Sequence, residues 1–172
     1  MNKIQLDDTD VGIIQQLQYD GRLPFTRIAA KLSISEGAVR RRVKRLTDSG
    51  VLQIVAVVEP QHLGLSAAGT IGITVQAGQV DAVAQRLAQF PEISYLFMVA
   101  GEFDLFAEVF CSDREHFVSF LNQTLQQVPG VERTRTFMIL KMYKLSYRWG
   151  EAEPPRAGHA AHIPLEKHEV DQ

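Results

Sequence analysis

Between residues 33 and 50 the chain reads SISEGAVRRRVKRLTDSG, and this stretch decides the fold of the N-terminal part of the chain. Ser35 is placed to cap a helix that runs from Glu36 to about Ser49, and Gly50 stands where helices commonly end. At about 100° per residue, three apolar positions fall within about 60° of one another and predict a buried stripe: Val39, Val43 and Leu46.

The opposite side of this helix is basic, because Arg40, Arg41 and Lys44 cluster there beside Gly37. Arginine makes two parallel hydrogen bonds to guanine, and a glycine lets the backbone approach a duplex closely. Two further side chains flank the stripe, where they reach phosphates or pack along the domain surface: Arg42 and Arg45. A basic helix face is also common on solvated surfaces, so the neighbouring elements decide its interpretation.

Two shorter helices are predicted before this one. Asp7 or Asp8 can cap the first, which has Asp10 in its first turn and ends near residues 19–21. Pro24 suits the first turn of the second helix, because its missing N–H would have no partner there. The expected buried positions are Val11, Ile14 and Leu17 in the first helix and Ile28, Ala29 and Leu32 in the second.

A strand or wing is predicted after the third helix, since the residues from Val51 to Val58 are mostly β-branched and apolar. Three short helices followed by a strand have the layout of a winged helix-turn-helix. In that motif the recognition helix, here the third helix, enters the major groove of DNA. The formal net charge is −2, yet only one acid, Glu36, stands among the basic residues of this region: Arg22, Arg27, Lys31, Arg40, Arg41, Arg42, Lys44 and Arg45. The local positive field predicts double-stranded DNA as a partner.

The second part of the chain alternates strand-like and helical patterns. The apolar runs are Thr70–Val75, Ile93–Ala100, Asp104–Cys111 and Thr134–Tyr143, and the helical patterns are Gln79–Phe90 and Asp113–Val128. This β-α-β-β-α-β order predicts a ferredoxin-like domain and an α+β chain. We expect a winged helix-turn-helix domain at residues 1–60, a linker at 61–69, the ferredoxin-like domain at 70–149 and a disordered tail at 150–172.

The strand Ile93–Ala100 is apolar on both of its faces. Strict alternation places one set of side chains on one face, Ile93, Tyr95, Phe97 and Val99, and the other set on the opposite face, Leu96, Met98 and Ala100. Two helices cover only one face of such a sheet, so the other face needs a different cover. The simplest cover for this face is the same face of a second copy of the chain, which predicts a homodimer.

Several classes of protein are disfavoured. No stretch approaches the roughly 20 apolar residues of a membrane helix, and the early acidic residues do not resemble a signal peptide, so we expect a cytoplasmic protein. The single cysteine, Cys111, follows an apolar run and is expected to be buried. No cofactor or structural zinc site is indicated, and the histidines of the tail are interpreted as incidental: His159, His162 and His168.

In their order and spacing, the motifs resemble the Lrp/AsnC family of transcription regulators of bacteria and archaea. The resemblance covers nearly everything up to Tyr147 and rests on Leu6–Asp10, Asp20–Arg22, Ile28–Leu32, Ser35, Val39–Leu46, Gly50–Leu52 and Leu63–Gly64. It implies a recognition helix from Ser35 to Arg45, a subunit-pairing strand at Val51–Val58, and dimers that assemble further, most often into octamers. The candidate DNA-binding residues are Arg22, Arg27, Ser35, Glu36, Gly37, Ala38, Arg40, Arg41, Arg42, Lys44 and Arg45.

The resemblance also implies that the C-terminal half binds a small effector, an amino acid in this family. Ala100–Asp104 resembles a Gly-x-x-Asp signature in which backbone groups and the aspartate hold the effector, and Thr134 and Thr136 match positions that line its cleft. A glycine lets N–H groups face a carboxylate, and an aspartate pairs with an ammonium group. From the residues alone, a tight turn whose aspartate caps the strand end is the simpler interpretation. The candidate effector residues are Met98, Ala100, Gly101, Glu102, Phe103, Asp104, Thr134 and Thr136.

Two other functions stay open. Sirohaem decarboxylases resemble the family in fold, and such an enzyme would need cationic or imidazole groups in the C-terminal cleft, whereas outside the tail only His62 and His116 supply imidazole. A metabolite sensor that acts through protein partners would not need the basic helix. We expect a regulator without catalytic activity that binds DNA sequence-specifically and whose assembly or DNA affinity changes with its effector.

Overall fold

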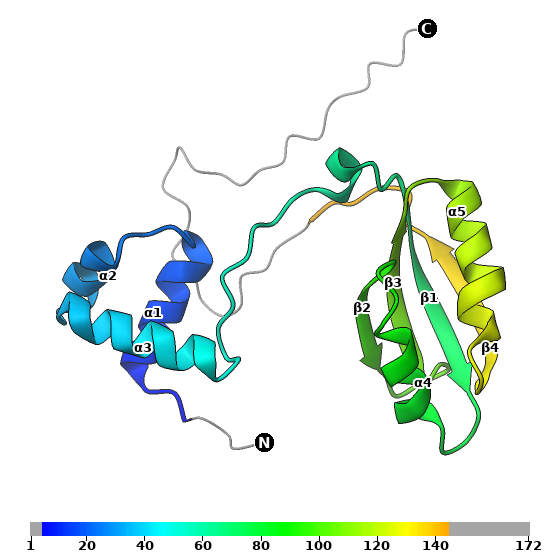
Figure 1. Ribbon diagram of the computed structural model, residues 1–172, viewed down its shortest axis with the longest axis horizontal. Coiled ribbons are helices and arrows are strands. Elements are labelled where there is room, and N and C mark those ends of the chain that lie inside the picture. Colours follow the sequence, from blue (N-terminus) through cyan, green and yellow to red (C-terminus); the bar gives the residue numbers. More distant parts are fainter. Residues whose placement is uncertain (1–4, 145–172) are drawn as a thin grey trace, which may run out of the picture. The chain divides into compact units, whose positions relative to one another are not determined.

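The computed structural model describes residues 5–144, and the chain divides into two compact units with the division at Val55 and Ala56 (Figure 1). The predicted tail at 150–172 and its three histidines lie outside the described residues. Three helices form the first unit: α1 (Asp8–Tyr19), α2 (Phe25–Leu32) and α3 (Glu36–Asp48). The helix-turn-helix prediction is therefore confirmed for this unit, with α2 and α3 as its two helices.

Local chemistry sets the ends of these helices. Asp7 caps α1 and Ser35 caps α3, each by accepting a hydrogen bond from a backbone N–H of the first turn. Between α2 and α3, Ser33 takes a left-handed conformation with φ of 54°, which turns the chain sharply. Pro24 immediately precedes α2 instead of lying inside its first turn. These devices make the three helices short and their connections tight.

The predicted stripe of α3 is confirmed, because Val39, Val43 and Leu46 are all buried. The predicted buried side of α1 is wrong at one position: Val11 is 41% exposed, whereas Ile13 is fully buried. Periodicity does not distinguish neighbouring apolar positions such as Ile13 and Ile14; the packing of α1 against α2 and α3 selects between them. The core of this unit consists of Ile13, Leu17, Ile28, Ala29, Val39, Val43, Leu46 and Leu52.

The strand or wing predicted at Val51–Val58 is not formed. Within the described chain, no residue of this segment pairs with a strand, and only Leu52 is buried. A strand needs a neighbour to exchange its backbone hydrogen bonds, and one copy of the chain provides none here. The side chains of Ile54, Val55 and Val57 accordingly stay at least half exposed. The N-terminal unit is thus a helix-turn-helix without a wing of its own.

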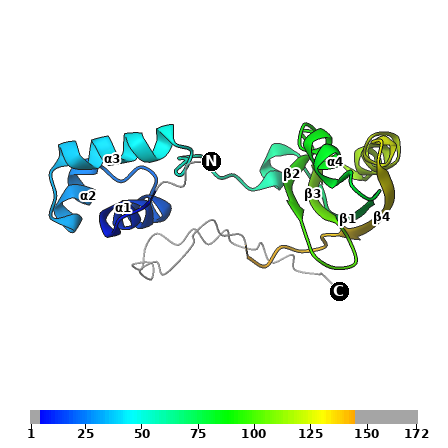
Figure 2. The same ribbon diagram turned by 90° about the horizontal axis from the view of Figure 1, so that it is seen from below.

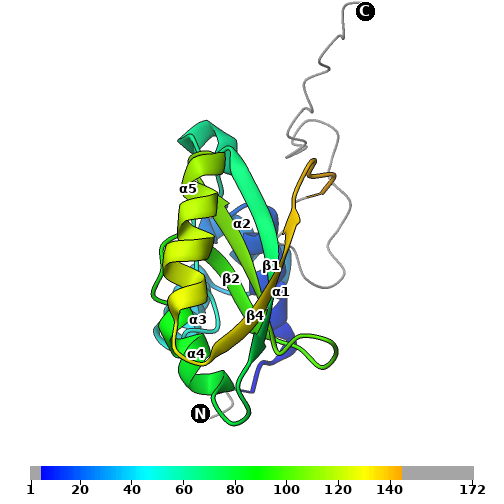
Figure 3. The ribbon, with the colours of Figure 1, turned by 90° about the vertical axis from the view of Figure 1, so that its right-hand side faces the viewer.

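The second unit has the predicted βαββαβ order. Its elements are β1 (Ala67–Val75), α4 (Val80–Leu87), β2 (Ile93–Met98), β3 (Leu105–Cys111), α5 (Arg114–Ser119) and β4 (Val131–Met138). A short 3-10 helix, η1 (Pro60–Leu63), precedes β1, while a π-helical turn, η2 (Phe120–Thr124), and a 3-10 turn, η3 (Leu125–Gln127), extend α5. Neighbouring strands are antiparallel in the order β2-β3-β1-β4. Figures 2 and 3 show α4 and α5 on the same side of this sheet.

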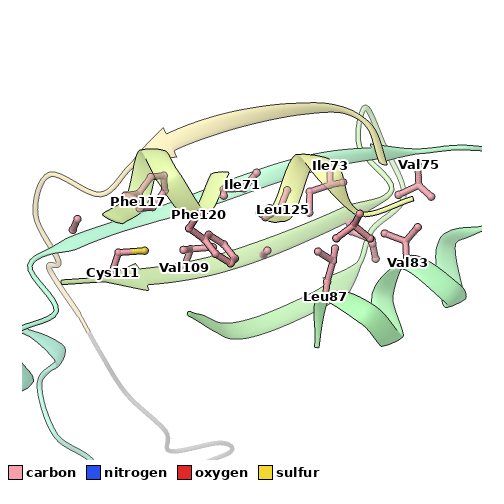
Figure 4. Packing of buried hydrophobic residues seen from close by; sticks show 14 residues of the cluster. Ile71, Ile73, Val75, Val83, Leu87, Val109, Cys111, Phe117, Phe120 and Leu125 are labelled. Carbon is pink, nitrogen blue, oxygen red and sulfur yellow. The ribbon is translucent and has the colours of Figure 1, made fainter. Parts of the chain in front are cut away.

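The core of the second unit lies between the sheet and these two helices (Figure 4). Ile71 and Ile73 of β1 meet Leu87 of α4 and Leu125 of the α5 extension, and all four are fully buried. Cys111 is also fully buried, as predicted, and burial raises the pKa of its thiol to about 11 with a smaller contribution from the carboxylates of Glu92 and Asp113. This thiol is therefore a packing group.

The face of the sheet away from the helices, called the open face below, carries exposed aromatic side chains. Tyr95 and Phe97 of β2 and Phe137 of β4 are each nearly half exposed there. The prediction that Ile93 shares this face is wrong, because a register shift between Ile93 and Tyr95 turns Ile93 toward the core. β4 also differs from the predicted run: it begins at Val131 and ends at Met138.

Replacing Val83 of α4 by alanine should lower the free energy of unfolding by about 2 kcal/mol, because the methyl groups it removes are fully buried and leave a cavity. The matched control is Val118→Ala on α5, where the side chain is 47% exposed and the expected change is below about 0.5 kcal/mol. Urea denaturation followed by circular dichroism measures both. Equal losses in the two variants would contradict the placement of the core.

Candidate nucleic-acid interface and effector loop

The basic side of α3 is held outward by its buried stripe and by its cap. The Ser35 hydroxyl accepts a hydrogen bond from the Ala38 N–H at 3.2 Å, which fixes the start of the helix. Gly37 lies exposed in the first turn, and a side chain there would meet only the end of Arg41. The backbone at Gly37 is therefore accessible to a ligand.

Arg41 is exposed and has no hydrogen-bond or ion-pair partner within residues 5–144. Arg40 bonds Glu36 at 2.7 Å, and its guanidinium lies 5.6 Å from the centre of the Phe25 ring. Lys44 bonds Asp48 at 2.5 Å. The two ion pairs join exposed residues one helical turn apart, so each contributes little and can exchange for a phosphate at small cost.

Arg42 and Arg45 are placed differently from the rest of the basic set. Both reach back to α1, where Arg42 bonds Asp7 at 2.7 Å and Asp10 at 2.8 Å and Arg45 bonds Asp10 as well. The Asp10 side chain is only 1% exposed. These four side chains, called the α1–α3 charge cluster below, hold two positive and two negative charges. In the structure, both arginines contact α1 through these ion pairs.

Sequence reasoning missed Asp10 as a structural residue. Its N–H donates to the Asp7 carboxylate at 2.8 Å, and the Asp7 N–H donates to the Asp10 carboxylate at 3.2 Å, which together make a capping box. The sequence contains the pattern of a capping box, because an acidic residue stands three positions after the capping aspartate. This local pattern does not predict the contacts of Asp10 with two arginines more than thirty residues away.

Burial by itself would raise the pKa of Asp10, but hydrogen bonds from Arg42, from Arg45 and from the Asp7 N–H outweigh it and lower this pKa to about 2. The pKa of Asp7 is lowered too, first by the Asp10 N–H and then by Arg42. Both carboxyl groups are therefore ionised at any physiological pH, and the cluster carries no net charge.

The remaining candidates of the DNA-binding set lie before α3. Arg22 is exposed in the turn after α1, where its N–H donates to Asp20 at 2.9 Å, and Arg27 is exposed on α2. Lys31 of α2 donates to the Gln16 side chain of α1 at 2.5 Å. On α3 itself, Arg40, Arg41 and Lys44 are exposed without a contact to α1, whereas Arg45 is 47% exposed but paired to Asp10.

In the second unit, the loop between β2 and β3 is anchored on the open face by Phe103. The Phe103 ring is buried over Gly72 of β1, where a Cβ atom would lie only 2.8 Å from the ring. The Arg135 guanidinium of β4 lies 5.6 Å from the centre of this ring and bonds Glu102 at 3.1 Å. The absence of a side chain at position 72 therefore leaves the space, called the seat below, into which Phe103 packs and on which the loop rests.

Asp104 ends the same loop with a structural contact. Its carboxylate accepts a hydrogen bond from the Val75 N–H at 2.8 Å, which extends the pairing of β1 with β3 by a side chain. Gly101 is different, because it does not adopt a left-handed conformation and a Cβ atom there would touch nothing within 4 Å. The fold of a single chain therefore gives a reason for an aspartate at position 104 but none for a glycine at position 101.

The structure does not bring all the candidate effector residues to one face. Thr134 and Thr136 pair with Ile73 and Ile71, so they share the helix-covered face, and Thr134 accepts a hydrogen bond from Gln126 at 2.7 Å. Met98 lies on that face as well, at the exposed end of β2. The other candidates belong to the loop: Ala100, Gly101, Glu102, Phe103 and Asp104.

The histidine considered for an enzyme, His116, lies near the start of α5. Its ring nitrogens lie 3.3 Å from Glu92 Oε1 and 3.3 Å from Ser112 Oγ. These contacts join the end of β3 to the turn before β2, outside the loop with the candidate effector residues. His62 belongs to η1 and is also distant in sequence from that loop.

Comparisons with known proteins identify both units. Residues 6–47 match the AsnC-type helix-turn-helix domain, and residues 69–149 match the Lrp/AsnC ligand binding domain. The HTH-type transcriptional regulator FL11 of Pyrococcus furiosus is 36% identical over 140 residues, which are 81% of this chain and 92% of the relative. The regulator LrpA of Pyrococcus horikoshii is 31% identical over 81% of this chain and 99% of its own length.

Solved structures agree with these matches. A transcriptional regulator from Neisseria meningitidis, in complex with L-methionine, is 28% identical and superimposes with a TM-score of 0.74 over 85% of this chain and 97% of its own. A feast or famine regulatory protein from Mycobacterium tuberculosis, complexed with L-methionine, is also 28% identical, with a TM-score of 0.76 over 84% and 99% of the two chains.

Replacing Asp10 by asparagine should lower the free energy of unfolding at neutral pH by about 2 kcal/mol, the equivalent of its lowered pKa. A lowered pKa gives stabilisation that is complete above the unfolded-state pKa of 3.8 and is lost as the pH falls toward about 2. The difference between wild type and variant should therefore shrink over that interval in urea denaturation series. Asp8→Asn, at an exposed position of the same turn, is the control. A difference that does not change with pH would contradict the ionic role of Asp10.

Proposed function

The chain belongs to the Lrp/AsnC family of transcription regulators, and from this premise we propose that it grips double-stranded DNA with the outward side of α3. The observation that carries this proposal is the exposed basic surface of Arg40, Arg41 and Lys44 on a capped helix whose opposite side is buried. A helix held in this way presents its side chains to the major groove in a fixed orientation. Arg22 and Arg27 supply further positive charge close by in the sequence.

We further propose that the loop Ala100–Asp104 contributes to the binding site for a small effector, an amino acid. Two structural neighbours at 28% identity were solved with L-methionine. Gly101 supports an external contact, because neither its backbone conformation nor its surroundings in the single chain require a glycine. Thr134 and Thr136 lie on the other face of the sheet, so the site proposed here would combine parts of more than one subunit.

The open face of the sheet supports a homodimer as the basic assembly, with higher oligomers such as an octamer built from it. Tyr95, Phe97 and Phe137 expose nearly half of their aromatic surface there, which a second copy would bury. An effector that prefers one assembly state changes the DNA affinity when the assembly states also differ in their affinity for DNA, and such couplings are about 1–3 kcal/mol. The protein then needs no catalytic step.

We propose a regulator without enzymatic activity, located in the cytoplasm where bacterial and archaeal DNA lies. No helix within residues 5–144 has both the length and the apolar composition to cross a membrane. The histidines that an enzyme of this fold would use, His62 and His116, belong to other parts of the second unit than the loop. Conversion of sirohaem by the purified protein would contradict this part of the proposal.

Arg41→Ala should weaken binding to a duplex of random sequence and reduce the slope of log affinity against log salt by about 0.9, because one phosphate contact is lost. Fluorescence anisotropy at several salt concentrations measures this slope. Arg86→Ala on α4, a surface arginine of the other unit, is the matched control and should leave the slope unchanged. A slope for Arg41→Ala equal to that of wild type would contradict the proposal that α3 contacts DNA.

L-methionine should raise the melting temperature of the full-length protein by mass action, because a ligand that binds only the folded state stabilises it. A thermal-shift screen with all the common amino acids at millimolar concentration tests whether methionine or another side chain is preferred. Gly101→Val should abolish the shift while leaving the melting temperature without ligand unchanged, since a larger side chain at this position has open space. No shift with any amino acid would contradict the proposed effector class.

A further inference from the structure

The α1–α3 charge cluster assigns a role to Asp10 that goes beyond stability, and this role rests on the proposed use of α3 as the DNA-binding helix. We propose that Asp10 is a positioning residue that withholds Arg42 and Arg45 from DNA phosphates, so that phosphate contact by α3 falls to Arg40, Arg41 and Lys44. The charge run of residues 40–45 contains five cations. According to this proposal, only three of them act on DNA.

The charges of the α1–α3 charge cluster balance one another. Arg42 and Arg45 bring two positive charges, and Asp7 and Asp10 bring two negative charges within hydrogen-bond distance. Because the pKa values of both aspartates are lowered, these charges persist throughout the physiological range of pH. A phosphate that approaches the cluster therefore meets no net positive charge and gains little from it.

The ion pairs of α3 differ in the free energy needed to exchange their carboxylate for a phosphate. Asp10 is 1% exposed, so a phosphate that took Arg45 away would leave a buried carboxylate with fewer hydrogen bonds. Glu36 and Asp48, the partners of Arg40 and Lys44, are 43% and 62% exposed and would be solvated at once if their cations turned to DNA. The same kind of ion pair is thus easily exchanged on the outer side of α3 and strongly held on the side toward α1.

The cluster also fixes the rotation of α3 about its own axis. Asp10 lies on α1, whereas both arginines lie on α3, three residues apart and therefore on one side of that helix. Two charge-assisted hydrogen bonds that the arginines donate to one buried carboxylate define this side more strictly than apolar packing does. The outward direction of Arg41 follows from that constraint.

The test compares salt slopes for binding of the full-length protein to a duplex of random sequence, using Arg45→Ala and Arg41→Ala as a matched pair. Both variants remove one arginine from the same helix. Arg41→Ala should reduce the slope by about 0.9, whereas Arg45→Ala should leave it at the wild-type value, because Arg45 does not touch a phosphate. A reduction of the same size with Arg45→Ala would overturn the proposal.

The second arm frees Arg45 by replacing Asp10. Asp10→Asn should raise the slope by about 0.9 and tighten binding to the random duplex, and the double variant Asp10→Asn with Arg45→Ala should return the slope to the wild-type value. A role of Asp10 in stability alone would change the fraction of folded protein and leave the slope unaltered, and that result would overturn the proposal. Circular dichroism checks that each variant is folded, and the Arg45→Ala arm does not depend on Asp10 variants.

The two hypotheses fail in different ways. If Arg41→Ala leaves the slope unchanged, α3 is not the DNA-binding helix and the proposed function itself is wrong. If Arg41→Ala reduces the slope and Arg45→Ala reduces it equally, the proposed function stands and the withholding of Arg45 by Asp10 is wrong.

Discussion

The desolvated carboxylate of Asp10 is the constraint on which the N-terminal unit depends. A buried charge is tolerated only with full compensation, and Asp10 obtains it from a backbone N–H of its own helix cap and from two arginines of α3. The same contact closes the capping box of α1 and connects α1 to α3. This interaction therefore supports the cap of α1 and, together with the buried stripe of α3, the orientation of the surface proposed to bind DNA.

The second unit follows from a different constraint, which is that two helices cover one face of a four-stranded sheet. The covered face holds the aliphatic core and the cysteine. The open face holds aromatic side chains and the seat on Gly72 where Phe103 anchors the loop between β2 and β3. The surface that needs a partner and the loop proposed to bind the effector are therefore built on the same sheet, so assembly and ligand binding have a structural route to influence each other.

The class of this protein and the contacts of its individual cations are established by different observations. The matches to known regulators establish the class of the protein and make an amino-acid effector the natural hypothesis. They do not say which of five neighbouring cations meet DNA. The distinction proposed here rests on hydrogen bonding in this chain, where Arg41 is free of carboxylates within the described residues and Arg42 and Arg45 are not.

Sequence alone determined the features that depend on neighbours along the chain. A cap at Asp7 or Asp8, the cap at Ser35, the buried stripe of α3 and the βαββαβ order were all predicted, because capping and periodicity act over a few residues. Only the tertiary structure decided which apolar residue of α1 is buried, that a register shift turns Ile93 to the core, and that Val51–Val58 has no strand partner in one chain. It alone joined Asp10 to arginines more than thirty residues away, because the energy of an ion pair depends on distance in space and on burial, which no local pattern encodes.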